Sequence, residues 1–106
     1  MIVVTTNDAP GYGVEKVLGP AFGVVVRSRG LGGNLTAAFR SLGGGEIKEY
    51  TEMLEGARRS AIDRMVENAH AMGANAVVGL RFDSSEIGQT MSEVVAYGTA
   101  CIVQAP

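Results

Sequence analysis

The stretch IKEYTEMLEGARRSAIDRMVENAHAM, residues 47–72, decides the fold because it carries the longest periodic pattern in the chain. Apolar side chains recur every three or four positions and charged residues lie between them, which is typical of an amphipathic helix. We therefore expect one long helix from Ile47 to Met72, ending at Gly73. The positions expected on its buried face are Tyr50, Met53, Leu54, Ala57, Ala61, Met65, Ala69 and Met72.

Short runs of β-branched and other apolar residues lie on both sides of this helix. They predict two strands before it and two after it, at residues 2–5, 14–28, 76–83 and 91–104. The second run contains Gly19 and Pro20. Because proline has no N–H, Pro20 belongs at a bulge or at the edge of a sheet. Residues 84–89 are expected to form a hairpin loop.

A second, shorter helix is expected at residues 35–42, where Asn34 supplies an N-cap and Gly43 a C-terminal stop. The expected order is therefore β-β-α-α-β-β. Consecutive strands with no helix between them favour hairpins, so we expect an α+β fold of two layers with a largely antiparallel sheet. The 106 residues leave room for a single domain, residues 1–106.

The expected strands are apolar on both faces. Successive strand residues point to opposite faces of a sheet. In residues 91–104 one face carries Val94 and Ala96, and the other carries Val95 and Tyr97. A sheet with water on one side normally alternates between apolar and polar residues. The long helix covers one face only, so we expect a second copy of the same chain to cover the other.

Composition narrows the partners and the compartment. Nine basic and eleven acidic residues give a net charge of −2, which provides no attraction for nucleic acid or an anionic membrane surface. No apolar run approaches the roughly 20 residues needed to span a bilayer. One Cys and the lack of a recognisable signal peptide favour a reducing, cytoplasmic location.

One stripe of the long helix carries side chains of types that bind metals. Asp63, Glu67 and His70 are spaced by four and three residues, which places them along one helix face. A Glu and a His three residues apart form the half-motif of carboxylate-bridged metal centres. The chain holds a single His, so such a site needs ligands from other subunits, and a solvated helix face is the alternative. Cys101 lies in an apolar strand and is expected in the core.

The sequence carries no recognisable enzyme signature. A nucleophile needs a base, and the base needs a group that orients it. His70 is the chain's one imidazole, and no nucleophile motif accompanies it. We therefore expect a protein that is not an enzyme.

Several segments together resemble one family. They are GGGEIKEY at 43–50, GANAVVG at 73–79 and YGTA at 97–100, and the resemblance extends over nearly the whole chain. The family is the YbjQ-like family, which is labelled as binding heavy metals. The resemblance implies a dodecin-like subunit that assembles into a homopentamer and binds a divalent metal ion. The residues that it favours for a ligand site are Arg27, Glu46, Tyr50, Asn75, Arg81 and Thr99.

These observations lead to one favoured function and two alternatives. The favoured function is a non-enzymatic homo-oligomer that binds a heavy metal or a small ligand. The first alternative is a structural or interaction scaffold without a ligand. The second is an enzyme whose site is shared between subunits.

Overall fold

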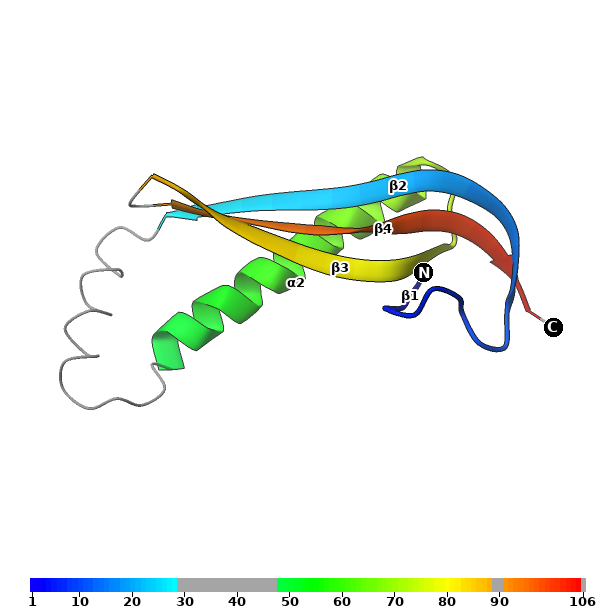
Figure 1. Ribbon diagram of the computed structural model, residues 1–106, viewed down its shortest axis with the longest axis horizontal. Coiled ribbons are helices and arrows are strands. Elements are labelled where there is room, and N and C mark those ends of the chain that lie inside the picture. Colours follow the sequence, from blue (N-terminus) through cyan, green and yellow to red (C-terminus); the bar gives the residue numbers. More distant parts are fainter. Residues whose placement is uncertain (29–47, 89–90, 106) are drawn as a thin grey trace.

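The structure is a computed structural model that describes residues 1–28, 48–88 and 91–105. This part of the chain forms four strands and one helix, with the helix against one face of the sheet (Figure 1). The elements are β1 (Ile2–Val3), β2 (Gly13–Ser28), α2 (Lys48–Ala71), β3 (Ala76–Ile87) and β4 (Met91–Gln104). The expected α+β class is confirmed. The short helix expected at 35–42 lies outside the described residues.

The long helix is confirmed as α2, whose bounds lie within one residue of those expected. Two backbone hydrogen bonds close its C-terminal end: Gly73 N–H donates to the carbonyl of His70, and Ala74 N–H donates to that of Ala69, both at 3.0 Å. Gly73 has a φ of 89°. Glycine adopts this left-handed conformation without a steric penalty, so it ends the helix as expected.

The sheet is mixed, and its strand order is β1-β3-β4-β2. β4 lies in the middle and pairs antiparallel with both β2 and β3. The expected hairpin between the first two strands is wrong, because β1 pairs parallel with β3, Ile2 opposite Ala76 and Val3 opposite Val77. The chain therefore crosses from one edge of the sheet to the other between β1 and β2. Strand order is not encoded in local periodicity, and the β1 pairing involves only two residues.

The third strand is longer than expected. β3 continues to Ile87, and Ser84, Ser85 and Glu86 pair with residues of β4 where the sequence predicts a loop. All three are exposed, so apolar burial gives no sequence signal for this half of the strand. Backbone hydrogen bonding to β4 keeps the segment extended although its side chains are polar.

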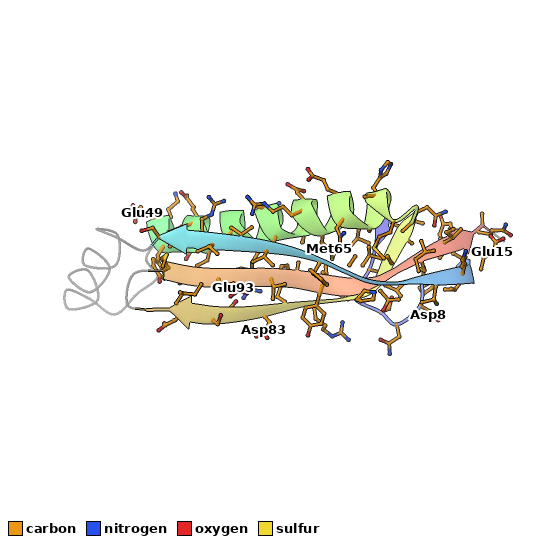
Figure 2. The ribbon with its side chains drawn as sticks, turned by 90° about the horizontal axis from the view of Figure 1, so that it is seen from above. Asp8, Glu15, Glu49, Met65, Asp83 and Glu93 are labelled. Atoms are coloured by element: carbon orange, nitrogen blue, oxygen red, sulfur yellow. The ribbon has the colours of Figure 1, made fainter. Side chains whose placement is uncertain are left out.

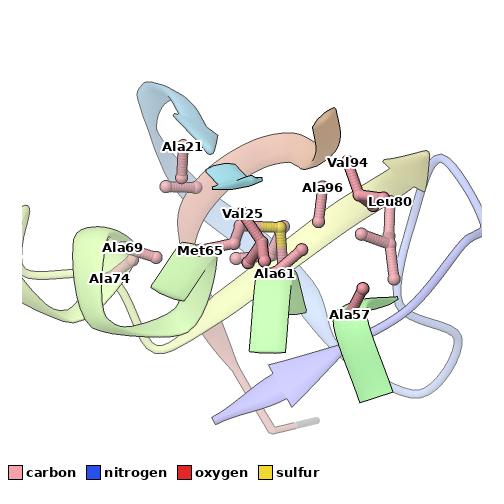
Figure 3. Close-up of a cluster of buried hydrophobic side chains, with 12 residues drawn as sticks. Ala21, Val25, Ala57, Ala61, Met65, Ala69, Ala74, Leu80, Val94 and Ala96 are labelled. Atoms are coloured by element: carbon pink, nitrogen blue, oxygen red, sulfur yellow. The ribbon is translucent and has the colours of Figure 1, made fainter. Parts of the chain in front are cut away.

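Small side chains on α2 allow the helix to lie close to the sheet. Its buried residues are Ala57, Ala61, Met65 and Ala69, and the Met65 side chain is fully buried (Figure 3). They pack against the β2 and β4 residues Ala21, Val25, Val94, Ala96 and Ala100. The helix lies mainly over β2, less over β4 and least over β3 (Figure 2).

Gly23 is the point of closest approach between β2 and α2. A Cβ atom at this position would collide with the carbonyl oxygen of Ala61 and the backbone nitrogen of Met65, and it would lie 2.7 Å from the Cβ of Arg64. The strand and the helix therefore touch through their backbones, which requires a residue without a side chain.

The described part of the molecule is long and thin. Its principal extents are 55 × 24 × 15 Å and its radius of gyration is 17.1 Å. A compact domain of this length has a radius of gyration of roughly 13 Å. One helix on one side of a long sheet produces this shape, and it leaves much of the opposite sheet face without a second layer.

The contact at Gly23 predicts a specific loss of stability. In Gly23→Ala the added methyl group must push α2 away from β2, and overpacking of this kind destabilises by about 3 kcal/mol. The matched control is Gly56→Ala, because a Cβ at Gly56 meets nothing within 4 Å. Alanine is the better helix former, so this control gains about 0.5–1 kcal/mol. Urea unfolding of both variants measures the difference, and equal stabilities would contradict the backbone contact.

Candidate functional site

The sheet face opposite α2, which we call the open face, is covered at one end. There the segment between β1 and β2 packs against β3 and β4 (Figure 1). Val4 N–H donates to the carbonyl of Val77 at 3.0 Å, and Gly79 N–H donates to that of Thr6 at 2.7 Å. The buried cluster beneath this segment consists of Ala9, Ala76, Val78, Cys101 and Val103.

Beyond this segment, the open face exposes a row of apolar side chains along β2. Phe22, Val24 and Val26 alternate along the strand and leave 55%, 39% and 49% of their surface exposed. Their β4 neighbour Tyr97, opposite Phe22, is 43% exposed. Val14 and Val17 lie opposite Val103 and Cys101 and continue the row toward the start of β2. We call the set the apolar strip: Val14, Val17, Phe22, Val24, Val26 and Tyr97.

The open face changes from apolar to polar across the sheet. Tyr97 lies between Phe22 on β2 and Arg81 on β3, and Val95 lies between Val24 and Asp83. The next row is Val26, Glu93 and Ser85, in which the Ser85 hydroxyl donates to a Glu93 carboxylate oxygen at 3.4 Å. The apolar strip therefore has a polar border on its β3 side. A polar rim around an apolar centre is typical of protein interfaces.

Two residues favoured for a ligand site make structural hydrogen bonds. The Asn75 side chain donates to the Val103 carbonyl at 2.9 Å and accepts from the Val103 N–H at 2.8 Å. Arg81 Nη1 donates to the carbonyl oxygens of Thr5 at 2.7 Å and Leu80 at 2.8 Å. Asn75 thus ties the end of α2 to β4, and Arg81 ties the segment after β1 to β3. Both contacts explain these residue types without a ligand.

The other favoured residues do not meet at one place. Arg27, at the end of β2, donates from Nη2 to the Ser60 hydroxyl of α2 at 3.2 Å. Tyr50 is half-buried in the first turn of α2, and Thr99 is half-buried on β4 between Pro20 and Val78. Glu46 lies outside the described residues. The set remains a prediction for a boundary between subunits.

The stripe predicted for a metal faces water. Asp63, Glu67 and His70 are all exposed on α2. Within residues 1–28, 48–88 and 91–105, no three side chains of His, Cys, Asp or Glu are grouped so that they hold a metal ion. An open groove of about 390 Å³ adjoins His70 and is lined by Met1, Ile2, Ala74 and Asn75. His70 is the one imidazole that a single chain can contribute to a metal ion at this groove.

Cys101 has the core position expected of it. Its side chain is fully buried in the cluster beneath the segment that follows β1. Burial raises the pKa of the thiol above its ordinary value of 9.0, because desolvation disfavours the thiolate. A soft metal binds the thiolate, so a buried neutral thiol is a poor ligand.

Sequence reasoning missed how α2 contacts β2. Arg64 and Asn68 lie within the stretch that predicts the long helix, and its periodicity predicts no contact for them. In the structure Arg64 Nη1 donates to the Val24 carbonyl at 2.6 Å. Asn68 Oδ1 accepts the Phe22 N–H at 3.1 Å. Their spacing of four residues is the one available signal, since it matches two positions on one helix face.

Comparisons with known proteins match nearly the whole chain to one family. Residues 1–104 match a family described as "Putative heavy-metal-binding". A UPF0145 protein of Bradyrhizobium sp. strain ORS 278 is 65% identical over 98% of this chain and 94% of its own length. A UPF0145 protein of Sulfurisphaera tokodaii is 56% identical over 97% of this chain and 90% of its own.

A solved structure has a similar fold. It is a protein of unknown function from Pediococcus pentosaceus, assigned to the DUF74 family, with a TM-score of 0.64 and 98% coverage of both chains. Its sequence is 16% identical to this one, so the likeness concerns the fold alone. In the described part of this chain, no helix combines the length and apolar character needed to cross a bilayer.

Burial of Cys101 predicts an alkaline loss of stability. The raised pKa means that the folded state favours the neutral thiol, so this contribution to stability is fully present only well below the ordinary pKa of 9.0 and is lost as the pH rises through the folded pKa. We expect the free energy of unfolding to fall above about pH 9, and to fall less in Cys101→Ala. We also expect a thiol reagent to label Cys101 only after unfolding. Rapid labelling of the folded protein at pH 8 would contradict the burial.

Proposed function

The chain belongs to the YbjQ-like family of UPF0145 proteins, and from this premise we propose that it acts as a homo-oligomer without enzymatic activity. In the proposed assembly, copies of the chain cover each other's apolar strips. Five copies, arranged as dodecin-like subunits in a closed ring, are the stoichiometry that we propose from the family resemblance. A heavy-metal ion or small ligand would bind at the boundaries between subunits.

The apolar strip is the observation that carries this proposal. Six apolar side chains along one strand and its neighbour are exposed to water, and Val17 and Phe22 leave 63% and 55% of their surface uncovered. Apolar area removed from water stabilises by about 25 cal/mol per Å². Exposed apolar side chains gathered along one strand, with a polar border, are typical of an interaction site.

The shape of the molecule favours a partner that forms a second layer. Sheets pack face to face about 10 Å apart when both carry apolar inner faces. The described part of the chain measures 15 Å in its thinnest direction, which corresponds to a single sheet and a single helix. Another copy of the chain is present at equal concentration, and in a closed ring each copy covers the apolar strip of its neighbour.

The donor chemistry of one chain does not fit a heavy-metal centre. The Cys101 thiol is buried and protonated, and the exposed stripe of Asp63, Glu67 and His70 provides no three-ligand cluster among the described residues. Structural zinc sites use four ligands and catalytic ones use three. We therefore propose that a metal ion is bound between subunits, where symmetry brings copies of His70 or of carboxylates together.

A scaffold without a ligand is the alternative that fits the same strip. The single buried thiol is consistent with a reducing, cytoplasmic location, which we include in the proposal. An enzyme with a shared site needs an acid or base beside a nucleophile at a subunit boundary. The three functions share one requirement, which is self-association through the open face.

Self-association through the apolar strip predicts the effect of a single charge. Phe22→Glu places a carboxylate in the centre of the strip, and its burial in an interface is strongly unfavourable. We expect this variant to elute as an 11.0 kDa monomer in size-exclusion chromatography with light scattering, whereas the parent protein elutes as an oligomer. Leu54→Glu is the matched control, because Leu54 is 39% exposed but lies on α2.

Two results would contradict the assembly. One is a parent protein that is monomeric at tens of micromolar concentration. The other is that Phe22→Glu and Leu54→Glu change the mass of the oligomer equally, which would show that self-association does not depend on the open face. Circular dichroism shows whether each variant retains its fold.

Metal binding between subunits predicts a ranking of two variants. Protein purified without chelator is assayed for metal content and then titrated with zinc, copper and nickel. His70→Ala should weaken binding more than Cys101→Ala, because His70 is exposed and Cys101 is buried. An equal or reversed effect would exclude the stripe of Asp63, Glu67 and His70. Full retention of metal by the monomeric Phe22→Glu variant would contradict a shared site.

A further inference from the structure

The outer edge of β2 is a place where chains can join in an unwanted way. β2 is the last strand on its side of the described sheet, and it is 16 residues long. An edge strand presents unpaired N–H and C=O groups that pair readily with a strand of another molecule. Addition at this edge extends the sheet in its own plane and does not cover the apolar strip on the open face.

Side chains of α2 occupy backbone groups at this edge. Phe22 and Val24 are two residues apart, so their backbone groups point to the same side, away from β4. The Phe22 N–H donates to Asn68 Oδ1 at 3.1 Å, and the Val24 carbonyl accepts from Arg64 Nη1 at 2.6 Å. One donor and one acceptor that an added strand needs are therefore already bonded within the chain.

The helix reaches the edge because of Gly23. The missing side chain lets the backbones of Ala61 and Met65 approach β2, and Arg64 and Asn68 lie one helical turn apart on the flank facing that edge. One turn earlier, the Ser60 hydroxyl accepts a hydrogen bond from Arg27 at 3.2 Å. Three successive turns of α2 thus contact the second half of β2, from Phe22 to Arg27.

The first half of β2 is closed by other means. Its pairing with β4 shifts register between Val14 and Lys16 and again between Val17 and Gly19. Bulges of this kind bend an edge strand away from a straight partner. Gly19 has a φ of 127°, and Pro20 has no N–H to offer. The regular, straight part of the edge is therefore the part that α2 contacts.

We propose that Arg64 and Asn68 close the outer edge of β2 to strand addition by a second copy of this chain. This inference goes beyond the proposed assembly, because it concerns an unwanted pairing of strands that Arg64 and Asn68 prevent. It holds for the single chain whether or not the open face binds a partner. Arg64 and Asn68 act by occupying the Val24 carbonyl and the Phe22 N–H at this edge.

The test removes both side-chain contacts. Arg64→Ala combined with Asn68→Ala frees the Phe22 N–H and the Val24 carbonyl. We expect this double variant to form large β-rich aggregates that bind thioflavin T, several-fold faster than the parent and increasingly with concentration. Asn68→Asp keeps an acceptor for the Phe22 N–H and should behave as the parent does. Arg59→Ala, which removes a charge from an exposed position of the same helix, is the control.

A third substitution identifies the edge itself. Val24→Pro removes the outward N–H of Val24, and proline is tolerated on an edge strand where the N–H faces solvent. Added to the double variant, it should suppress the aggregation. Suppression by Val24→Pro is not expected if the aggregates arise from general unfolding, because proline gives no protection to an unfolded chain.

The proposal is overturned in two ways. One is a double variant that retains its far-UV circular dichroism and the oligomer size of the parent. The other is aggregation that Val24→Pro leaves unchanged, or that is accompanied by loss of the α2 helix signal. A parent protein that is monomeric would refute the open-face assembly and leave this test intact, so failures of the two proposals are distinguishable.

Discussion

The contact between the backbones of β2 and α2 at Gly23 is the constraint on which the rest of the structure depends. It holds the helix over the β2 side of the sheet, because the backbones of Ala61 and Met65 lie directly against the strand at Gly23. The small buried alanines of α2 also allow the helix to lie close to the sheet. From this position Arg64 and Asn68 reach the outer edge of β2, and the sheet face behind the helix stays open.

The apolar strip is the part of this thin molecule that its own helix and loops leave uncovered in the described residues. One helix buries one face of the sheet, and the segment after β1 buries one end of the other face. The remaining face combines an apolar row on β2 with a polar border on β3. In the proposed assembly, closure of the β2 edge and exposure of the open face together direct neighbouring copies of the chain to that face.

The sequence predicts the elements of this fold better than their arrangement. Periodicity over 47–72 gives α2 to within a residue, and Gly73 gives its end, because both signals are local. The partner of β1 and the polar half of β3 are not predicted, since they depend on backbone pairing with distant strands. For the site, the two-faced strands predict the open face. The hydrogen bonds that occupy Asn75 and Arg81 are invisible before the chain is folded, and family likeness alone favoured both for a ligand.

Hydroxyl-radical footprinting of the unmodified protein in solution tests most directly whether the open face is covered. In a single chain Phe22 and Tyr97 leave 55% and 43% of their surface exposed, and Leu54 on α2 leaves 39%. With each rate normalised to that of the denatured chain, we expect strong protection of Phe22 and Tyr97 but not of Leu54. Labelling of Phe22 and Tyr97 at rates equal to or above that of Leu54 would contradict a covered open face.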